Sequence, residues 1–300
     1  MIEDMGINDE HCKSSRRNDR LWDGNTVAGE RRMRRLAAVI IAALFTVSAA
    51  CAEITVGSLG ADYDSFTQAV YETVDSGEDI IVFPGEYDIL QEYIDYFGID
   101  TLNDQTELGN GFQYGIRLHD RRVKFLPGAK VRCVWYFPAD YTARFCPVYV
   151  GNNVTLEGLD LYAEGMEYAI HDDIWQWDEP YVNEYHHCRV IGKNLFGANC
   201  IGGGVAQNSR IIIDNCYFDN NAPGSVTVRY HNTAYENADG DIWISDSYFN
   251  GYFAASYYGT TSHLNVYVNG CRAEKIETRK ETADSMVENI DLFKWNNETE

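Results

Sequence analysis

An internal repeat constrains the fold of this chain more than any other sequence feature. Five segments resemble one another, and four of them share a strand-like stretch, a polar or glycine pair, a small residue and a second short strand. The aligned small positions are separated by 29, 28, 31 and 24 residues, and they are Leu159, Cys188, Cys216, Ser247 and Cys271. Repeats of this length with short strands predict stacked coils, because a single coil cannot bury its apolar side alone.

Stacking places equivalent side chains of successive coils about 4.8 Å apart. We therefore interpret Cys188, Cys216 and Cys271 as an internal packing column, since a free cysteine behaves as a small buried hydrophobe. The alternatives for these residues are metal binding and disulfide formation. Cys133 and Cys146 flank an expected excursion from the coil, VWYFPADYTARF, which a disulfide between them would close.

The residues before the repeat predict a capped first coil. A helix is expected after the capping pair Asp64-Ser65, with Phe66, Ala69, Val70 and Val74 on its apolar face and Gly77 ending it. The strands expected around this helix are Ile54 to Val56, Asp79 to Phe83 and, after the turn Pro84-Gly85, Tyr87 to Ile89. Near the other end of the chain, Asn289 to Trp295 is expected to close the last coil.

This N-terminal pattern resembles the cap of right-handed parallel β-helix proteins of the pectin-lyase-like superfamily, in which a short amphipathic helix covers the open end of the coil. With the repeat, the resemblance covers roughly residues 54–275. It implies an all-β fold, a single-stranded right-handed parallel β-helix with a short N-terminal capping helix. This scaffold hosts lyases, hydrolases, isomerases, esterases and adhesins, so the resemblance does not name an activity.

The first 52 residues differ from the rest of the chain. A basic cluster, RRMRR, precedes an uncharged apolar run of 15 residues and the small-residue sequence Ala50-Cys51-Ala52, as in a secretory signal peptide. We predict an over-extended start or disordered leader over 1–32, a signal peptide over 33–52 and the β-helix over 53–300. The protein is then secreted or held at the cell surface, with no membrane span after cleavage, because the run is shorter than the roughly 20 residues a span needs.

The hexapeptide YAIHDD is the strongest candidate for chemistry. It ends a strand of the coil that begins with NVTLEGLDL, and His171, Asp172 and Asp173 are its candidate acid/base or cation-holding residues. Two coils later, VTVRYHN ends the corresponding strand with His231 and Asn232 as candidate substrate ligands. Two rungs correspond to about 10 Å between backbones, a spacing that could hold one sugar residue or one ion.

A loop rich in aromatic and acidic residues separates the two motifs. Trp175 and Trp177 could stack on sugar faces, and Arg229 could neutralise a uronate or abstract a proton. Carboxylates of the loop would also suit Ca²⁺, although we assign no metal ligands. The alternative is that the loop aromatics pack on the coil and its acids are solvated. The glycine run IGGGV, residues 201–205, is expected to form a tight coil corner rather than a nucleotide loop.

These features predict a protein that acts on or binds a polysaccharide or cell-surface glycan. As an enzyme it would be a polysaccharide lyase or a glycoside hydrolase. Of the motifs of polygalacturonase-like hydrolases, only the aspartate pair has a counterpart in this chain, at Asp172-Asp173. The competing class is a non-catalytic adhesin or phage-tail-like receptor module, and a third is a scaffold with no glycan role. The net charge of −22 argues against a nucleic-acid partner, because like charges repel. The sequence leaves the oligomeric state open.

Overall fold

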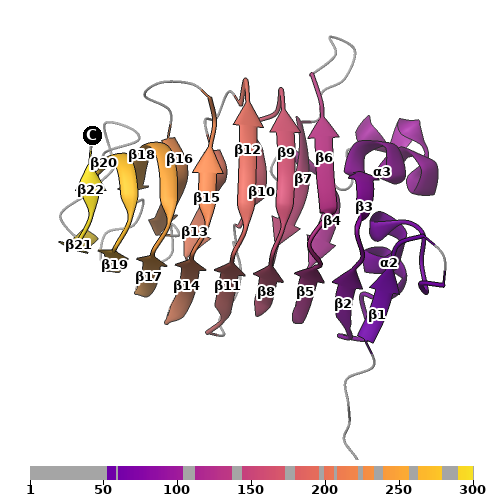
Figure 1. Ribbon diagram of the computed structural model, residues 1–300, viewed down its shortest axis with the longest axis horizontal. Helices are drawn as coiled ribbons and strands as arrows, with labels where there is room; N and C mark the ends of the chain where they lie inside the picture. Colours follow the sequence, from indigo (N-terminus) through magenta and orange to yellow (C-terminus); the bar gives the residue numbers. More distant parts are fainter. Residues whose placement is uncertain are drawn as a thin grey trace, which may run out of the picture. The chain divides into compact units, whose positions relative to one another are not determined.

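The computed structural model describes residues 53–58, 60–103, 112–136, 144–172, 180–195, 199–205, 208–221, 226–232, 239–256, 263–278 and 290–299. The expected leader and signal peptide therefore lie outside the described residues. Within these ranges the chain forms a stack of coils whose strands pair in parallel (Figure 1). The prediction of an all-β parallel β-helix is confirmed.

The first face of the stack is a nine-stranded parallel sheet. Its strands alternate buried and outward residues, as in Ser209–Asp214, because one side of the sheet faces the core. In spatial order they are β1 (Glu53–Val56), β2 (Asp79–Val82), β5 (Arg121–Phe125), β8 (Val154–Glu157), β11 (Val182–His186), β14 (Ser209–Asp214), β17 (Gly240–Ser245), β19 (Leu264–Asn269) and β21 (Ile290–Trp295).

The second and third faces are joined through β18 (Tyr248–Ser256), whose start pairs with β15 and whose end pairs with β16. The second face also contains β3 (Gly85–Asp88), β6 (Ala129–Val134), β9 (Asp160–Glu164), β12 (Arg189–Lys193), β15 (Tyr217–Asp219), β20 (Arg272–Ile276) and β22 (Glu298–Thr299). The third face contains β4 (Phe112–Leu118), β7 (Arg144–Val150), β10 (Tyr168–His171), β13 (Asn199–Val205) and β16 (Val226–Asn232).

A two-residue corner connects the first face to the second in successive coils, and it explains the repeat. Its first residue has a positive φ, between 47° and 74°, which favours glycine, asparagine and aspartate. These residues are Gly158, His187, Asn215, Asp246, Gly270 and Asn296. The second residue is the small residue of the repeat, and Leu159, Cys188, Cys216, Ser247 and Cys271 are all buried.

These buried corner residues, together with Asn297, form what we call the corner column. The predicted internal column is confirmed, and its members also hydrogen-bond. The N–H of Cys188 donates to Cys216 Sγ at 3.4 Å, and the N–H of Cys216 donates to Ser247 Oγ at 3.0 Å. The N–H of Cys271 donates to Asn297 Oδ1 at 2.8 Å. Small polar side chains therefore satisfy corner amides that strand pairing leaves unpaired.

The six cysteines of the described ranges are free and buried, so the alternative disulfide between Cys133 and Cys146 is not formed. Burial raises the pKa of the Cys146 and Cys200 thiols above the ordinary range. A thiol held in its neutral form is a poor nucleophile and a poor metal ligand. The cysteines therefore serve packing and the corner column.

Replacing Ser247 with alanine tests the corner column. The N–H of Cys216 would lose its acceptor inside a buried corner, and we expect the free energy of unfolding to fall by about 1–3 kcal/mol. Urea unfolding followed by circular dichroism measures this loss. Ser247→Cys is the matched control, because its sulfur can accept as Cys216 does for Cys188. Equal losses for the two variants would contradict a hydrogen-bonding role.

The predicted capping helix is confirmed as α2 (Phe66–Glu72), with Ser65 at the N-cap accepting from the N–H of Gln68. The helix is shorter than expected, because Thr73 ends it and leaves Val74 45% exposed. The expected strand up to Ile89 is wrong in its last residue. The Asp88 side chain instead caps a second helix, α3 (Ile89–Phe97), which a 3-10 turn (Ile99–Asn103) follows.

Glu92 ties the two helices together. Its Oε2 accepts from Ser65 Oγ and from the N–H of Thr67, both at 2.8 Å. This carboxylate binds the positive end of α2, where unpaired N–H groups and the helix dipole favour an anion. Burial nevertheless raises the pKa of Glu92, and the hydrogen bonds from Thr67 and Ser65 oppose that rise. The helices α2 and α3 pack on one another and on β4, and so cover the N-terminal coil.

At the last described strand of the first face, strand pairing and a lysine side chain make the contacts with the preceding coil. The strand β21, where the expected closing strand is confirmed, is the last strand of the first face. Lys294 on β21 is in register with the buried Val268, and its ammonium group donates to the carbonyl oxygen of Ile276 at 3.1 Å. No helix among the described residues is long and apolar enough to cross a membrane.

Candidate functional site

The third face brings several of the predicted site residues into one row. Strand pairing aligns His171 of β10 with Tyr149 of β7 and with Gly202 of β13, and Gly202 with Arg229 of β16. Tyr149 is also paired with Arg117 of β4. We call this row, Arg117, Tyr149, His171, Gly202 and Arg229, the third-face row.

The register corrects one expectation about the two histidine motifs. They do lie two rungs apart, about 10 Å between backbones. Arg229, however, is the residue in line with His171, whereas His231 pairs with Gly204 and lies two residues farther along β16. Arg229 and His231 are both half-buried. Asn232 ends β16 opposite Val205.

His171 is enclosed by tyrosines and is only 4% exposed. Its Nδ1 and the hydroxyl of Tyr114 are 2.9 Å apart and share a hydrogen bond. The ring of Tyr168 is stacked at 4.7 Å between centroids, and Tyr149 approaches edge-on at 6.2 Å. The guanidinium of Arg117 lies 5.3 Å from the centre of the Tyr114 ring, within cation–π range. These contacts fix the orientation of the imidazole.

Asp172 faces the interior of the coil, unlike its neighbour His171. It is fully buried, and its Oδ2 accepts from the hydroxyls of Tyr185 at 2.7 Å and Tyr230 at 3.0 Å. Its Oδ1 accepts from Asn183 Nδ2 at 2.9 Å. The three donors are themselves buried. These are the contacts of a carboxylate that holds adjacent coils together, and its catalytic role stays a prediction.

The interior network also perturbs the tyrosines. Burial raises the pKa of both Tyr185 and Tyr230 well above the ordinary value, and the negative charge of Asp172 adds to the effect. Both hydroxyls therefore remain protonated donors to the carboxylate at neutral pH. Tyr181, also buried, donates to the carbonyl of Gly204 at 3.3 Å.

The glycine run at 201–205 is a strand rather than the expected coil corner. It forms β13 between β10 and β16, and its residues are buried. A Cβ built at Gly202 would overlap the carbonyl oxygen of Arg229 on the neighbouring strand. Glycine is therefore required by the close approach of two backbones.

The remaining predicted residues lie outside the described part of the chain. Asp173, Trp175 and Trp177 belong to this group, as do Asp178 and Glu179 of the carboxylates considered for Ca²⁺. Asp172, the remaining carboxylate of that set, accepts from interior donors. Over the described ranges, no group of three or more histidine, cysteine or acidic residues could hold a metal ion. The roles predicted for these residues stay predictions.

Sequence reasoning missed four residues around His171, namely Arg117, Tyr114, Tyr149 and Tyr168. Tyr168 lies in the hexapeptide YAIHDD, at the start of the strand that His171 ends, and its ring stacks on the imidazole. The other three come from β4 and β7, which precede the recognisable repeat. Extending the coil alignment backwards from His171 is the signal that would have found Tyr149 and Arg117.

No protein-family model, curated protein or solved structure matches this chain.

Proposed function

We propose that this protein binds a polysaccharide along its third face, with His171 at the centre of the site. The observation that carries the proposal is the third-face row, in which an enclosed histidine is aligned with Tyr149 and with Arg117 and Arg229. Rings supply apolar contact to sugar C–H groups, and guanidinium groups donate several hydrogen bonds to hydroxyls or carboxylates. An extended ligand suits a face whose equivalent positions recur on every rung, about 4.8 Å apart.

A second candidate function is catalysis on the bound polysaccharide, as a lyase or a glycoside hydrolase. The observation that favours it is the 2.9 Å hydrogen bond between His171 Nδ1 and the Tyr114 hydroxyl. Two groups that can exchange a proton within hydrogen-bond reach are a usual arrangement for acid/base chemistry. The contacts of Asp172 with interior donors favour His171 and Tyr114 over the Asp172-Asp173 pair as the reacting groups.

The proposal is tested with the full chain against a panel of neutral and uronate-containing polysaccharides, with binding measured by affinity electrophoresis. Replacing Arg117 or Arg229 with glutamine removes a charged donor, and we expect each change to weaken binding about tenfold, the equivalent of about 1.4 kcal/mol. Reducing ends and the ultraviolet absorbance of unsaturated ends report product. Product lost in His171→Gln and Tyr114→Phe would support the catalytic candidate.

Arg189→Gln is the matched control for these variants. Arg189 is an exposed arginine of the second face that pairs with Asp160 at 2.9 Å, so its replacement is expected to leave binding unchanged. Absence of binding to every polysaccharide in the panel would overturn the proposal. So would an equal loss in the control and in the third-face variants.

A further inference from the structure

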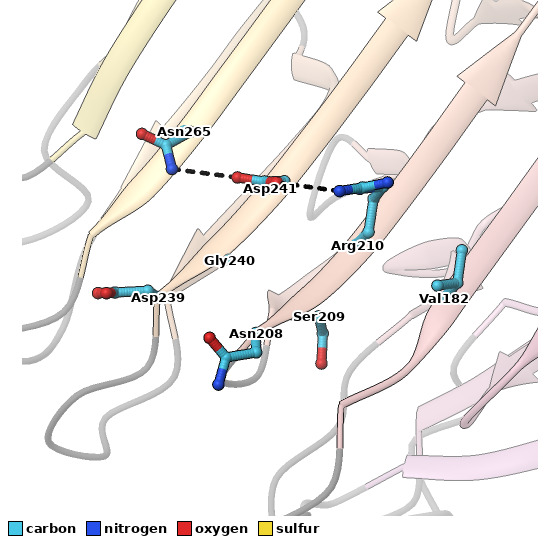
Figure 2. Close-up of a pocket in the computed structure, with 8 residues that line it drawn as sticks. All are labelled: Val182, Asn208, Ser209, Arg210, Asp239, Gly240, Asp241 and Asn265. Carbon is cyan, nitrogen blue, oxygen red and sulfur yellow. Dashed lines mark hydrogen bonds and ion pairs between the residues drawn. The ribbon is translucent and has the colours of Figure 1, made fainter.

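A polar depression lies on the first face, away from the third-face row. It sits over the first residues of β11, β14, β17 and β19 and has a volume of about 430 Å³ (Figure 2). The size is within the range of small-molecule sites, which span roughly 300–1,000 Å³. The lining residues that matter here are Val182, Ser209, Arg210, Asp239, Asp241 and Asn265.

Four of these residues form a row across neighbouring strands. Pairing aligns Val182 with Arg210, Arg210 with Asp241, and Asp241 with Asn265. Asp241 Oδ1 accepts from Asn265 Nδ2 at 3.0 Å, and Asp241 Oδ2 lies 3.5 Å from Arg210 Nη2 (Figure 2). The Asp241 carboxylate therefore links donors on both sides of it, and the row is organised before any ligand arrives.

The side chains of the depression disfavour an anion, because the carboxylates of Asp239 and Asp241 outnumber the guanidinium of Arg210, which already pairs with Asp241. Among the residues that the structure describes, no group of three or more histidine, cysteine or acidic side chains could hold a metal ion here. A neutral molecule with several hydroxyl groups meets no such repulsion and needs no metal. Each hydroxyl can both donate and accept, so it can bridge a carboxylate and a guanidinium or amide at once.

Apolar side chains lie at one end of the depression and farther along the same strands. Val182 closes one end of the row and is 39% exposed. On β17, Trp243 is the next outward residue after Asp241 and is 40% exposed. Tyr267 stacks on its indole at 4.0 Å, and Phe293 stacks on Tyr267 at 5.0 Å. The first face thus places fixed polar groups in the depression and aromatic rings at the next outward positions of β17 and β19, an arrangement that suits a carbohydrate ring.

We propose that this depression binds one or two sugar residues of a neutral oligosaccharide, with Arg210, Asp241 and Asn265 contacting the hydroxyls and Val182 and Trp243 contacting the C–H groups. The site is independent of the third-face row and goes beyond the proposed function, because it adds a second carbohydrate site on a different face. A glycan chain engaged at both sites would gain avidity from the linkage.

The test uses the full chain and neutral oligosaccharides, namely maltotriose, cellotriose and xylotriose, with affinities measured by isothermal titration calorimetry. We expect at least one of these probes to bind the wild type. Asp241→Asn and Arg210→Gln are expected to weaken that binding about tenfold, because each loses a charge-assisted hydrogen bond. Asn265→Ala serves as a further variant, and thermal unfolding checks that every variant is folded.

The second face offers a matched pair of control variants, Asp160→Asn and Arg189→Gln. These residues form the same acid–guanidinium pair across neighbouring strands, at 2.9 Å. Affinity lost in the first-face variants but kept in the controls would support the proposal. Failure of all three probes to bind, or an equal loss in the controls, would overturn it.

The third-face variants Arg117→Gln and Arg229→Gln separate this inference from the proposed function. Trisaccharide binding that survives in them but is lost in Asp241→Asn assigns the trisaccharide to the first face. Trisaccharide binding lost only in the third-face variants would overturn the first-face site and leave the proposed function intact.

Discussion

Asp172→Ala is expected to lower the free energy of unfolding by about 3–5 kcal/mol, among the largest losses that a single substitution in this protein can produce. The change removes the shared acceptor of two buried tyrosine hydroxyls and one buried amide. These donors come from β11 and β16, so the carboxylate joins the first face to the third. Urea unfolding monitored by tyrosine and tryptophan fluorescence measures the loss.

Asp160→Ala is the control for this prediction. Asp160 is a surface aspartate whose exposed ion pair with Arg189 is expected to contribute less than about 1 kcal/mol. A loss for Asp172→Ala no larger than that of the control would show that the interior network does not stabilise the stack. In that case Asp172 would have to be explained by function alone.

Gly202→Ala is expected to destabilise the fold by about 3 kcal/mol through overpacking. The added methyl group would overlap the carbonyl oxygen of Arg229, so β13 and β16 would have to separate. The same movement would shift Arg229 relative to His171, and we expect weaker polysaccharide binding at temperatures where the variant is still folded. Thermal unfolding and affinity electrophoresis measure the two effects.

Gly77→Ala separates this collision from the general effect of losing a glycine. Gly77 has a φ of 64°, but the nearest atom to its added Cβ, the carbonyl oxygen of Asp120, is 3.7 Å away. Only the left-handed backbone would then be strained, by about 1–2 kcal/mol. A smaller effect at Gly202 than at Gly77 would argue against close approach of the two strands.

Much of the fold could be predicted because its corners leave a short-range signal. A left-handed residue followed by a small buried one, as in Asn215-Cys216 and Asp246-Ser247, marks the corner in the sequence. The helix α3 left no comparable signal. It begins directly after β3, and Asp88, the last residue of β3, is also the N-cap of the helix. The prediction for 201–205 was wrong because glycine runs are typical of turns, whereas here the run forms a buried strand in which the backbone of Arg229 leaves no room for a Cβ at Gly202.

The candidate site was less accessible to sequence reasoning because it depends on register. The position of His171 at a strand end followed from the coil pattern. Its alignment with Arg229 rather than His231 did not, since the segments between strands differ in length from coil to coil. The partners of Asp172 lie as far as 58 residues away in the chain, beyond the reach of any local motif.

Different groups hold the first coil of the described stack and its last strand β21. The helices α2 and α3 seal the N-terminal coil, whereas at the other end a lysine ammonium group, that of Lys294, binds a backbone carbonyl of the preceding coil. In such a stack each coil contacts only its neighbours. Adding or deleting one coil next to β21 would therefore lengthen or shorten the molecule by about 4.8 Å while leaving the seal unchanged.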